Sequence, residues 1–143
     1  MAISSNEALS SILQANWSSA GSGLTLADIE WSTSQIDIKK WNENKTAPKN
    51  IVSVYCGKNP STKILYPGAW RDDDELTIEV LVKGDTFANL KQTRNNIADQ
   101  IKAILKANAN TTDNFFIKPK RSTANEAFVY ARQVLTVTVS RLL

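Results

Sequence analysis

The chain contains no histidine and a single cysteine, Cys56, among its 143 residues. Without histidine it has no Ser-His-Asp triad, no Cys-His pair, no histidine base and no histidine-based zinc site. One cysteine cannot form a disulfide within the chain, and there is no CxxC pair. Since no base lies nearby in the sequence to activate its thiol, Cys56 is predicted to be a small apolar filler of the core.

Glycine and long apolar runs are also scarce. Among the five glycines, neither GxGxxG nor GxxxxGK followed by Ser or Thr occurs, so no phosphate-binding loop is indicated. No apolar run is long enough to span a membrane, and the N-terminus lacks the basic and continuous apolar segments of a secretory signal. The sequence therefore predicts no cofactor and no membrane contact. Catalysis by an Asp/Glu pair or a lysine stays formally possible, but no motif points to it. The sequence predicts a cytoplasmic location, or an assembly built in the cytoplasm.

What is present is the composition of an ordinary folded domain. Hydrophobic residues make up 42% and charged residues 22%, which is typical of globular proteins, and the length suits a single domain over 1–143. The net charge of +3 is small, and the basic residues are spread out. A dedicated nucleic-acid binder usually clusters them in a stripe.

The N-terminal third is weakly patterned. Ser4 and Glu7 have the spacing of a capping box, and apolar residues at helical spacing follow, which predicts a helix over about 5–18. The polar segment 19–50 is too long for a plain connector, so it is predicted either to pack as an arm or to carry an interface. Trp31 and Trp41 in this segment suggest a surface that a partner covers.

From residue 51 the pattern sharpens into alternating strands and one long helix. Short strands are predicted over 51–56 and 63–66, a half-buried strand over 76–82, and a helix over about 86–107. A strand then starts at Phe115, a hairpin or edge follows over 118–122, and a last strand runs over 130–143. This order predicts an α+β fold, in which an antiparallel sheet of about four strands is packed by the long helix and the N-terminal helix.

Four consecutive carboxylates, Asp72, Asp73, Asp74 and Glu75, form the acidic run. Such a run is typical of a solvated turn before a strand. Two alternatives remain, a Mg²⁺ or Ca²⁺ site and a contact with a basic patch on a neighbouring molecule. The side chains of consecutive residues diverge, and no second acidic cluster lies nearby, so the turn is favoured.

The basic segment, Lys118, Lys120 and Arg121, is the densest cluster of positive charge. It is predicted to be an exposed hairpin kept unpaired by its charges, or else a loop that lines a nucleic-acid channel or meets acidic residues of a partner. The pair Trp70-Arg71 is either a binding hot spot or a core tryptophan with a polar neighbour.

Arg94 falls in the middle of the apolar face of the long helix. Two interpretations are open. The aliphatic stem can lie on the core while the guanidinium reaches solvent, or the side chain can form a buried or inter-subunit ion pair.

The arrangement from residue 50 onward resembles a known protein family. A short strand ends in Tyr55-Cys56-Gly57, and a Pro-Gly-x-Trp-Arg segment over 67–71 leads into the strand 76–82. Gly84-Asp85 precedes the long helix, and a strand, hairpin and strand end the chain. Together with the leading helix, this order is similar to the small tail terminator and tail-to-head joining (tail completion) proteins of tailed bacteriophages and related viruses.

The resemblance implies a virion protein that is not an enzyme and is assembled in the host cytoplasm. Such proteins form a ring, usually of six subunits, that caps the head-proximal end of the tail tube and meets the neck or connector proteins, with DNA passing through the lumen. A closed ring needs two unlike surfaces on each subunit. The acidic run and the basic segment are candidates for these surfaces, or one of them for the lumen. The candidate interface or lumen residues are Lys118, Lys120, Arg121, Asp72, Asp73, Asp74, Glu75, Trp70, Arg71 and Arg94.

Other functions remain open from the sequence. The first alternative is another neck component, such as a stopper or a head-completion adaptor. The second is a small cellular α+β module that binds a protein or peptide, and an enzyme using carboxylates and a metal ranks third.

Overall fold

The computed structural model describes residues 4–56, 61–66, 69–84, 86–109, 115–126 and 130–142. Over these residues the fold is α+β, as predicted. The helices are α1 (Ser5–Ala15), α2 (Ser19–Ser22), α3 (Ile38–Glu43) and α4 (Phe87–Ala107), with a short 3-10 helix η1 (Leu26–Asp28). The strands are β1 (Glu30–Ser32), β2 (Asn50–Cys56), β3 (Ser61–Tyr66), β4 (Ala69–Lys83), β5 (Phe115–Glu126) and β6 (Tyr130–Leu142).

The sheet is mixed and has six described strands, where about four antiparallel strands were expected. The order is β1-β2-β4-β6-β5, and β3 pairs with β4 beyond the end of β2. The β1–β2 pair is parallel, and the other pairs are antiparallel. At 15 residues, β4 is long enough to pair with β3 near its start and with β2 near its end.

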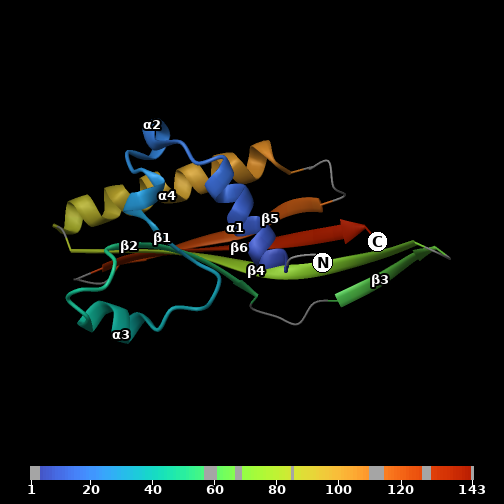
Figure 1. Cartoon of the computed structure of the whole chain (residues 1–143), viewed down its shortest axis with the longest axis horizontal. Helices are drawn as coiled ribbons and strands as arrows, with labels where there is room; N and C mark the ends of the chain where they lie inside the picture. The colour runs from blue at the N-terminus through green and yellow to red at the C-terminus, as the bar shows by residue number, and fades with distance from the viewer. Residues whose placement is uncertain are drawn as a thin grey trace.

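Helices α1 and α4 cover one face of this sheet, and α2 packs on α4 (Figure 1). Even-numbered residues of β4, such as Leu76, Ile78 and Val80, point into this layer because strand side chains alternate between faces. They meet the apolar stripe of α4, whose members include Ile97 and Ile101. Helix and sheet thereby bury each other's apolar surface and form the main core. No helix in the described ranges has the length and apolar content needed to cross a membrane.

The predicted long helix is confirmed, and the N-terminal helix ends earlier than expected. The N-cap of α4 is Thr86, whose side chain accepts a hydrogen bond from the Asn89 amide. Helix α1 stops at Ala15, and the Trp17 indole beyond it donates to the Leu24 carbonyl at 2.9 Å. The predicted capping box is not formed, because the Ser4 side chain makes no cap hydrogen bond.

The segment 19–50 packs against the domain and contains α2, η1, β1 and α3. Trp31 packs edge-to-face against Trp17, with ring centroids 5.3 Å apart. Trp41 on α3 is 5% exposed, and its indole donates to the Pro48 carbonyl at 2.7 Å. The chain itself therefore covers the aromatic residues that were expected to need a partner.

Candidate functional site on the open sheet face

The second face of the sheet lies opposite the helical layer, and only one end of it is covered, by α3 (Figure 1). We call this surface the open face. Strand pairing places side chains from β2, β4, β5 and β6 on it, because paired residues point to the same side. The polar ones are Ser53, Tyr55, Asp73, Glu75, Thr77, Glu79, Lys118, Arg121, Thr123, Arg132, Thr136, Thr138 and Ser140, and the apolar ones include Ile51, Leu81 and Val134. The open face is therefore rich in charge and hydroxyl groups.

A buried ion pair lies on this face of the sheet, beside the end that α3 covers. Arg132 donates from Nη2 and Nε to the same oxygen of Glu79, Oε2, at 2.6 and 3.0 Å. The Glu79 side chain is 1% exposed and that of Arg132 is 29% exposed. The other carboxylate oxygen, Oε1, makes no hydrogen bond within the part of the chain that the structure describes. A carboxylate in this setting depends on its arginine, because burial of an uncompensated charge is costly.

Tyr55 extends this cluster on β2, where it pairs with Thr77 of β4. Burial raises the pKa of its phenol above 10.0, and the negative charge of Glu79 raises it further, while Arg132 opposes the change. The phenol therefore stays protonated and can donate a hydrogen bond beside the ion pair. Together, Tyr55, Glu79 and Arg132 form a polar cluster on this face of the sheet.

The acidic run lies within β4, so the predicted turn is wrong. The carboxylates of Asp73, Asp74 and Glu75 point alternately to the two faces of the sheet. Asp73 accepts a hydrogen bond from the Ser140 hydroxyl at 2.7 Å on the open face. Asp74 points to the helical layer and accepts one from Ser5 at the start of α1, where the helix dipole favours a negative charge. These distant hydroxyl partners allow the acidic residues to continue the strand.

The acidic run and the basic segment meet on one surface. Glu75 and Lys118 both pair with Thr138, one from each side of β6. Since neighbouring strands lie about 4.8 Å apart, the backbones of Glu75 and Lys118 are separated by about 10 Å. Thr77 and Arg121 flank Thr136 in the same way. This placement favours one mixed-charge surface over two separate patches of opposite charge.

Four other candidates are placed by backbone alone, and their side chains lie outside the description. Trp70 pairs with Ile64 of β3, and Arg71 and Asp72 continue β4. Lys120 occupies the register shift of β5 between Pro119 and Arg121. Trp70, Arg71 and Asp72 thus belong to the β3–β4 hairpin, and Lys120 to an edge strand.

Two further predictions are corrected by burial. Arg94 is 3% exposed, so the guanidinium does not reach solvent, and its Nε and Nη2 donate to Asn95 Oδ1 at 3.1 and 2.8 Å. The side chain is therefore buried, and the ion pair of the second interpretation stays a prediction. Cys56, expected in the core, is exposed at the end of β2.

The described residues contain no group of three or more His, Cys, Asp and Glu side chains placed to hold a metal ion.

Sequence reasoning did not identify Tyr55, Glu79 and Arg132. In the sequence, Glu79 stands out only as a charged residue within the predicted half-buried strand, on the face opposite its apolar residues. Its pairing with Arg132 depends on long-range strand register.

No protein-family model and no curated protein matches this sequence. A function for the chain is therefore inferred from its surfaces.

Proposed function

We propose that the chain is a structural subunit of a ring that caps the head-proximal end of a bacteriophage tail tube and joins the tail to the neck. DNA passes through the centre of this ring. The order of elements supports the proposal, since α1 precedes the β2–β4 pair, α4 follows, and the β5–β6 hairpin ends the described chain. This is the order on which the family resemblance rests.

The observation that carries the proposal is that the sheet extends past its helical cover. Residues 69–73 of β4 pair with β3, and this hairpin projects beyond the ends of α1 and α4 (Figure 1). β6 also pairs with residues 71–73 of β4, so only residues 69 and 70 form a two-stranded end with β3. A two-stranded end is marginally stable in water unless another layer packs on it. A projecting hairpin of this kind is suited to contact with another subunit.

The edge strand β5 provides a second, different surface. Its first half is protected, since the Ile117 amide donates to the Ala109 carbonyl at 2.9 Å and Pro119 has no amide hydrogen to offer. Its second half, residues 121–124, is exposed at every position. A hairpin and a strand edge at different places on one subunit are the unlike surfaces that head-to-tail assembly requires.

The mixed charge of the open face suits a channel for DNA. A strongly basic lining would hold phosphates through many ionic contacts. On the open face Lys118 and Arg121 are offset by Glu75 and Asp73. Such a surface lets DNA slide without retaining it.

Electron microscopy of the purified protein tests the ring. We expect ring-shaped particles with a central hole and a native mass near that of a hexamer. A particle that stays monomeric alone and in the presence of tail tubes contradicts the proposal and favours a small protein-binding module.

A second assay separates a terminator from another neck component, such as a stopper or head-completion adaptor. Tail-tube protein is allowed to polymerise with and without the purified chain. A terminator stops elongation and is found at tube ends, whereas a stopper or adaptor leaves tube length unchanged.

A further inference from the structure

We infer that neighbouring copies join head to tail by seating Leu26 of one copy in an apolar pocket between α4 and β5 of the next. The inference rests on the proposed ring function and names the contact that builds the ring. It follows from the shape, exposure and charge of two surfaces at opposite edges of the sheet.

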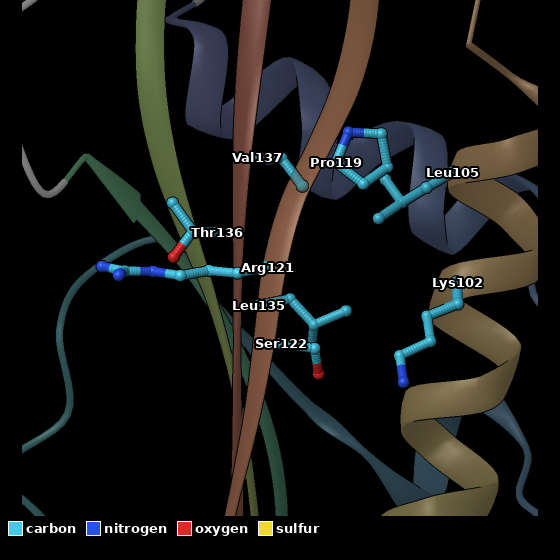
Figure 2. A pocket seen from close by; sticks show the side chains of 8 residues that line it. All are labelled: Lys102, Leu105, Pro119, Arg121, Ser122, Leu135, Thr136 and Val137. Atoms are coloured by element: carbon cyan, nitrogen blue, oxygen red, sulfur yellow. The ribbon is translucent and has the colours of Figure 1, made fainter.

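The pocket lies where α4 passes over β5 and β6 (Figure 2). Its volume is about 250 Å³. Leu105, Leu135 and Val137 form its apolar floor, and Lys102 and Pro119 lie at its margin. Small-molecule sites usually measure roughly 300–1,000 Å³, so a pocket of this size suits an inserted side chain better than a ligand.

The register shift of β5 helps to keep the pocket open. Between Pro119 and Arg121 the strand holds one extra residue, which changes the side to which the following side chains point. Arg121 consequently points away from α4, toward the open face, together with Thr136 (Figure 2). Its long side chain therefore leaves the space beside Lys102 and Leu105 free.

Leu26 is the complementary protrusion. At 45% exposed it is the large hydrophobic residue that the described part of the chain leaves in solvent. It opens η1, which is fixed by hydrogen bonds from the Thr25 amide and hydroxyl to Asp28 Oδ2 at 2.8 and 3.0 Å. The Leu26 carbonyl also accepts from the Ile29 amide at 3.3 Å. Leu26 is therefore presented on a preorganised turn, which lowers the entropy cost of binding.

The two surfaces lie at opposite edges of the sheet, so one chain cannot join them. Leu26 precedes β1 at one edge, and the pocket lies beside β5 at the other edge. Contact between unlike surfaces generates a ring or an open filament, depending on the rotation between subunits. Leu26 and the pocket thus form a head-to-tail interface between copies.

The charges that flank these surfaces are complementary. Asp28 and Glu30 are exposed beside Leu26, and Lys102 and Arg121 are exposed beside the pocket. Glu30 pairs with Ile51, which places it on the same side of the sheet as Arg121. Opposite charges at an interface fix its register and speed association. This complementarity favours a second copy as the occupant of the pocket.

Sedimentation over a concentration series tests the contact. Leu26→Asp should weaken self-association about tenfold to a hundredfold, because an apolar anchor is replaced by a charge that avoids the pocket. Gln35→Asp, an exposed position on the same segment, is the matched control and should associate like wild type. Arg121→Glu should weaken association, and adding Glu30→Lys should restore it. All these variants should keep the wild-type melting temperature, since each changed side chain is exposed.

Cross-linking identifies the partner surfaces directly. In a Cys56→Ser background, Leu26→Cys combined with Lys102→Cys should give a ladder of oligomers on mild oxidation, while Gln35→Cys with Lys102→Cys should not. Rings that persist in Leu26→Asp, together with the absence of a ladder, overturn this interface and leave the ring function standing. A wild-type protein that shows neither association nor cross-linking counts against both.

Discussion

The carboxylate of Glu79 depends on Arg132, its partner in the buried ion pair. Replacing Arg132 with Met keeps much of the side-chain volume. It removes the hydrogen-bond donor of the Glu79 carboxylate, which is only 1% exposed. Because such a charge is costly to bury, we expect a loss of about 3 kcal/mol in the free energy of unfolding, measured in urea. Combining Glu79→Leu with Arg132→Met should recover most of this loss. If the two single changes simply add, the pair is not coupled.

Tyr55 makes stability depend on pH at the alkaline end. Its pKa in the folded protein is raised above 10.0, so the unfolded chain releases the phenolic proton first as the pH rises. Tyr55 therefore contributes stability that is present below pH 10.0 and is lost as the pH rises through the folded pKa. An ultraviolet titration that follows phenolate formation should show a late component that ionises above pH 10.0, and Tyr55→Phe should remove it.

Glu79→Gln provides the control for this titration. Removing the negative charge should lower the Tyr55 pKa toward its ordinary value, since Glu79 is one cause of the increase. A late component that Glu79→Gln leaves unchanged would mean that burial alone sets the pKa.

At the scale of elements, α3 is held to the sheet by Lys83. The Lys83 ammonium donates to the Asn44 carbonyl at 2.8 Å and to the Trp41 carbonyl, and it lies 4.8 Å from the centre of the Trp41 ring. Lys83→Met keeps the aliphatic stem but removes these contacts. We expect a loss of about 1–2 kcal/mol, with faster hydrogen exchange in α3 and unchanged exchange in α4.

Lys45→Met is the matched control for this variant, because Lys45 is exposed on the segment that follows α3. It should leave the exchange of α3 unchanged. Equal effects of the two substitutions would show that Lys83 has no special role in holding α3.

Helices and strands whose apolar residues repeat at a regular spacing were predictable from the sequence. Those that depend on partners far away in the chain were not. The 3.6-residue repeat predicted α4, and the alternation from Leu76 predicted the second half of β4. The first half of β4 was taken for a turn, since the hydroxyl partners of Asp73 and Asp74 lie in β6 and α1. β1 is three residues long and pairs in parallel with β2, so no local pattern indicates it.

At the scale of the whole molecule, fold class followed from the order of elements, and the candidate site did not. The charged residues of the acidic run and the basic segment were identifiable in the sequence. That Glu75 and Lys118 share one face, on either side of Thr138, is set by the register of β4, β6 and β5. A register error of one residue reverses the face of every side chain in a strand. A sequence pattern therefore cannot supply the composition of the open face.

The role of the open face is tested by reversing its charge. Replacing Lys118, Lys120 and Arg121 with Glu makes the face strongly acidic, so DNA phosphates should be repelled from it. Under the ring function proposed above, a phage that carries this variant should give far fewer infectious particles. The same charge change at Lys39, Lys40 and Lys45 is the control and should have little effect.

Electron microscopy assigns the defect in this variant to one of two steps. Rings that form normally but give DNA-filled heads without functional tails place the defect at DNA passage or joining. Missing rings place it at subunit contact, where Arg121 also lies in our proposal. Because Lys118 precedes the register shift and lies outside residues 121–124, the exposed second half of β5, Lys118→Glu alone should impair passage while leaving rings intact. A wild-type titre in the triple variant would remove the open face from any contact with DNA.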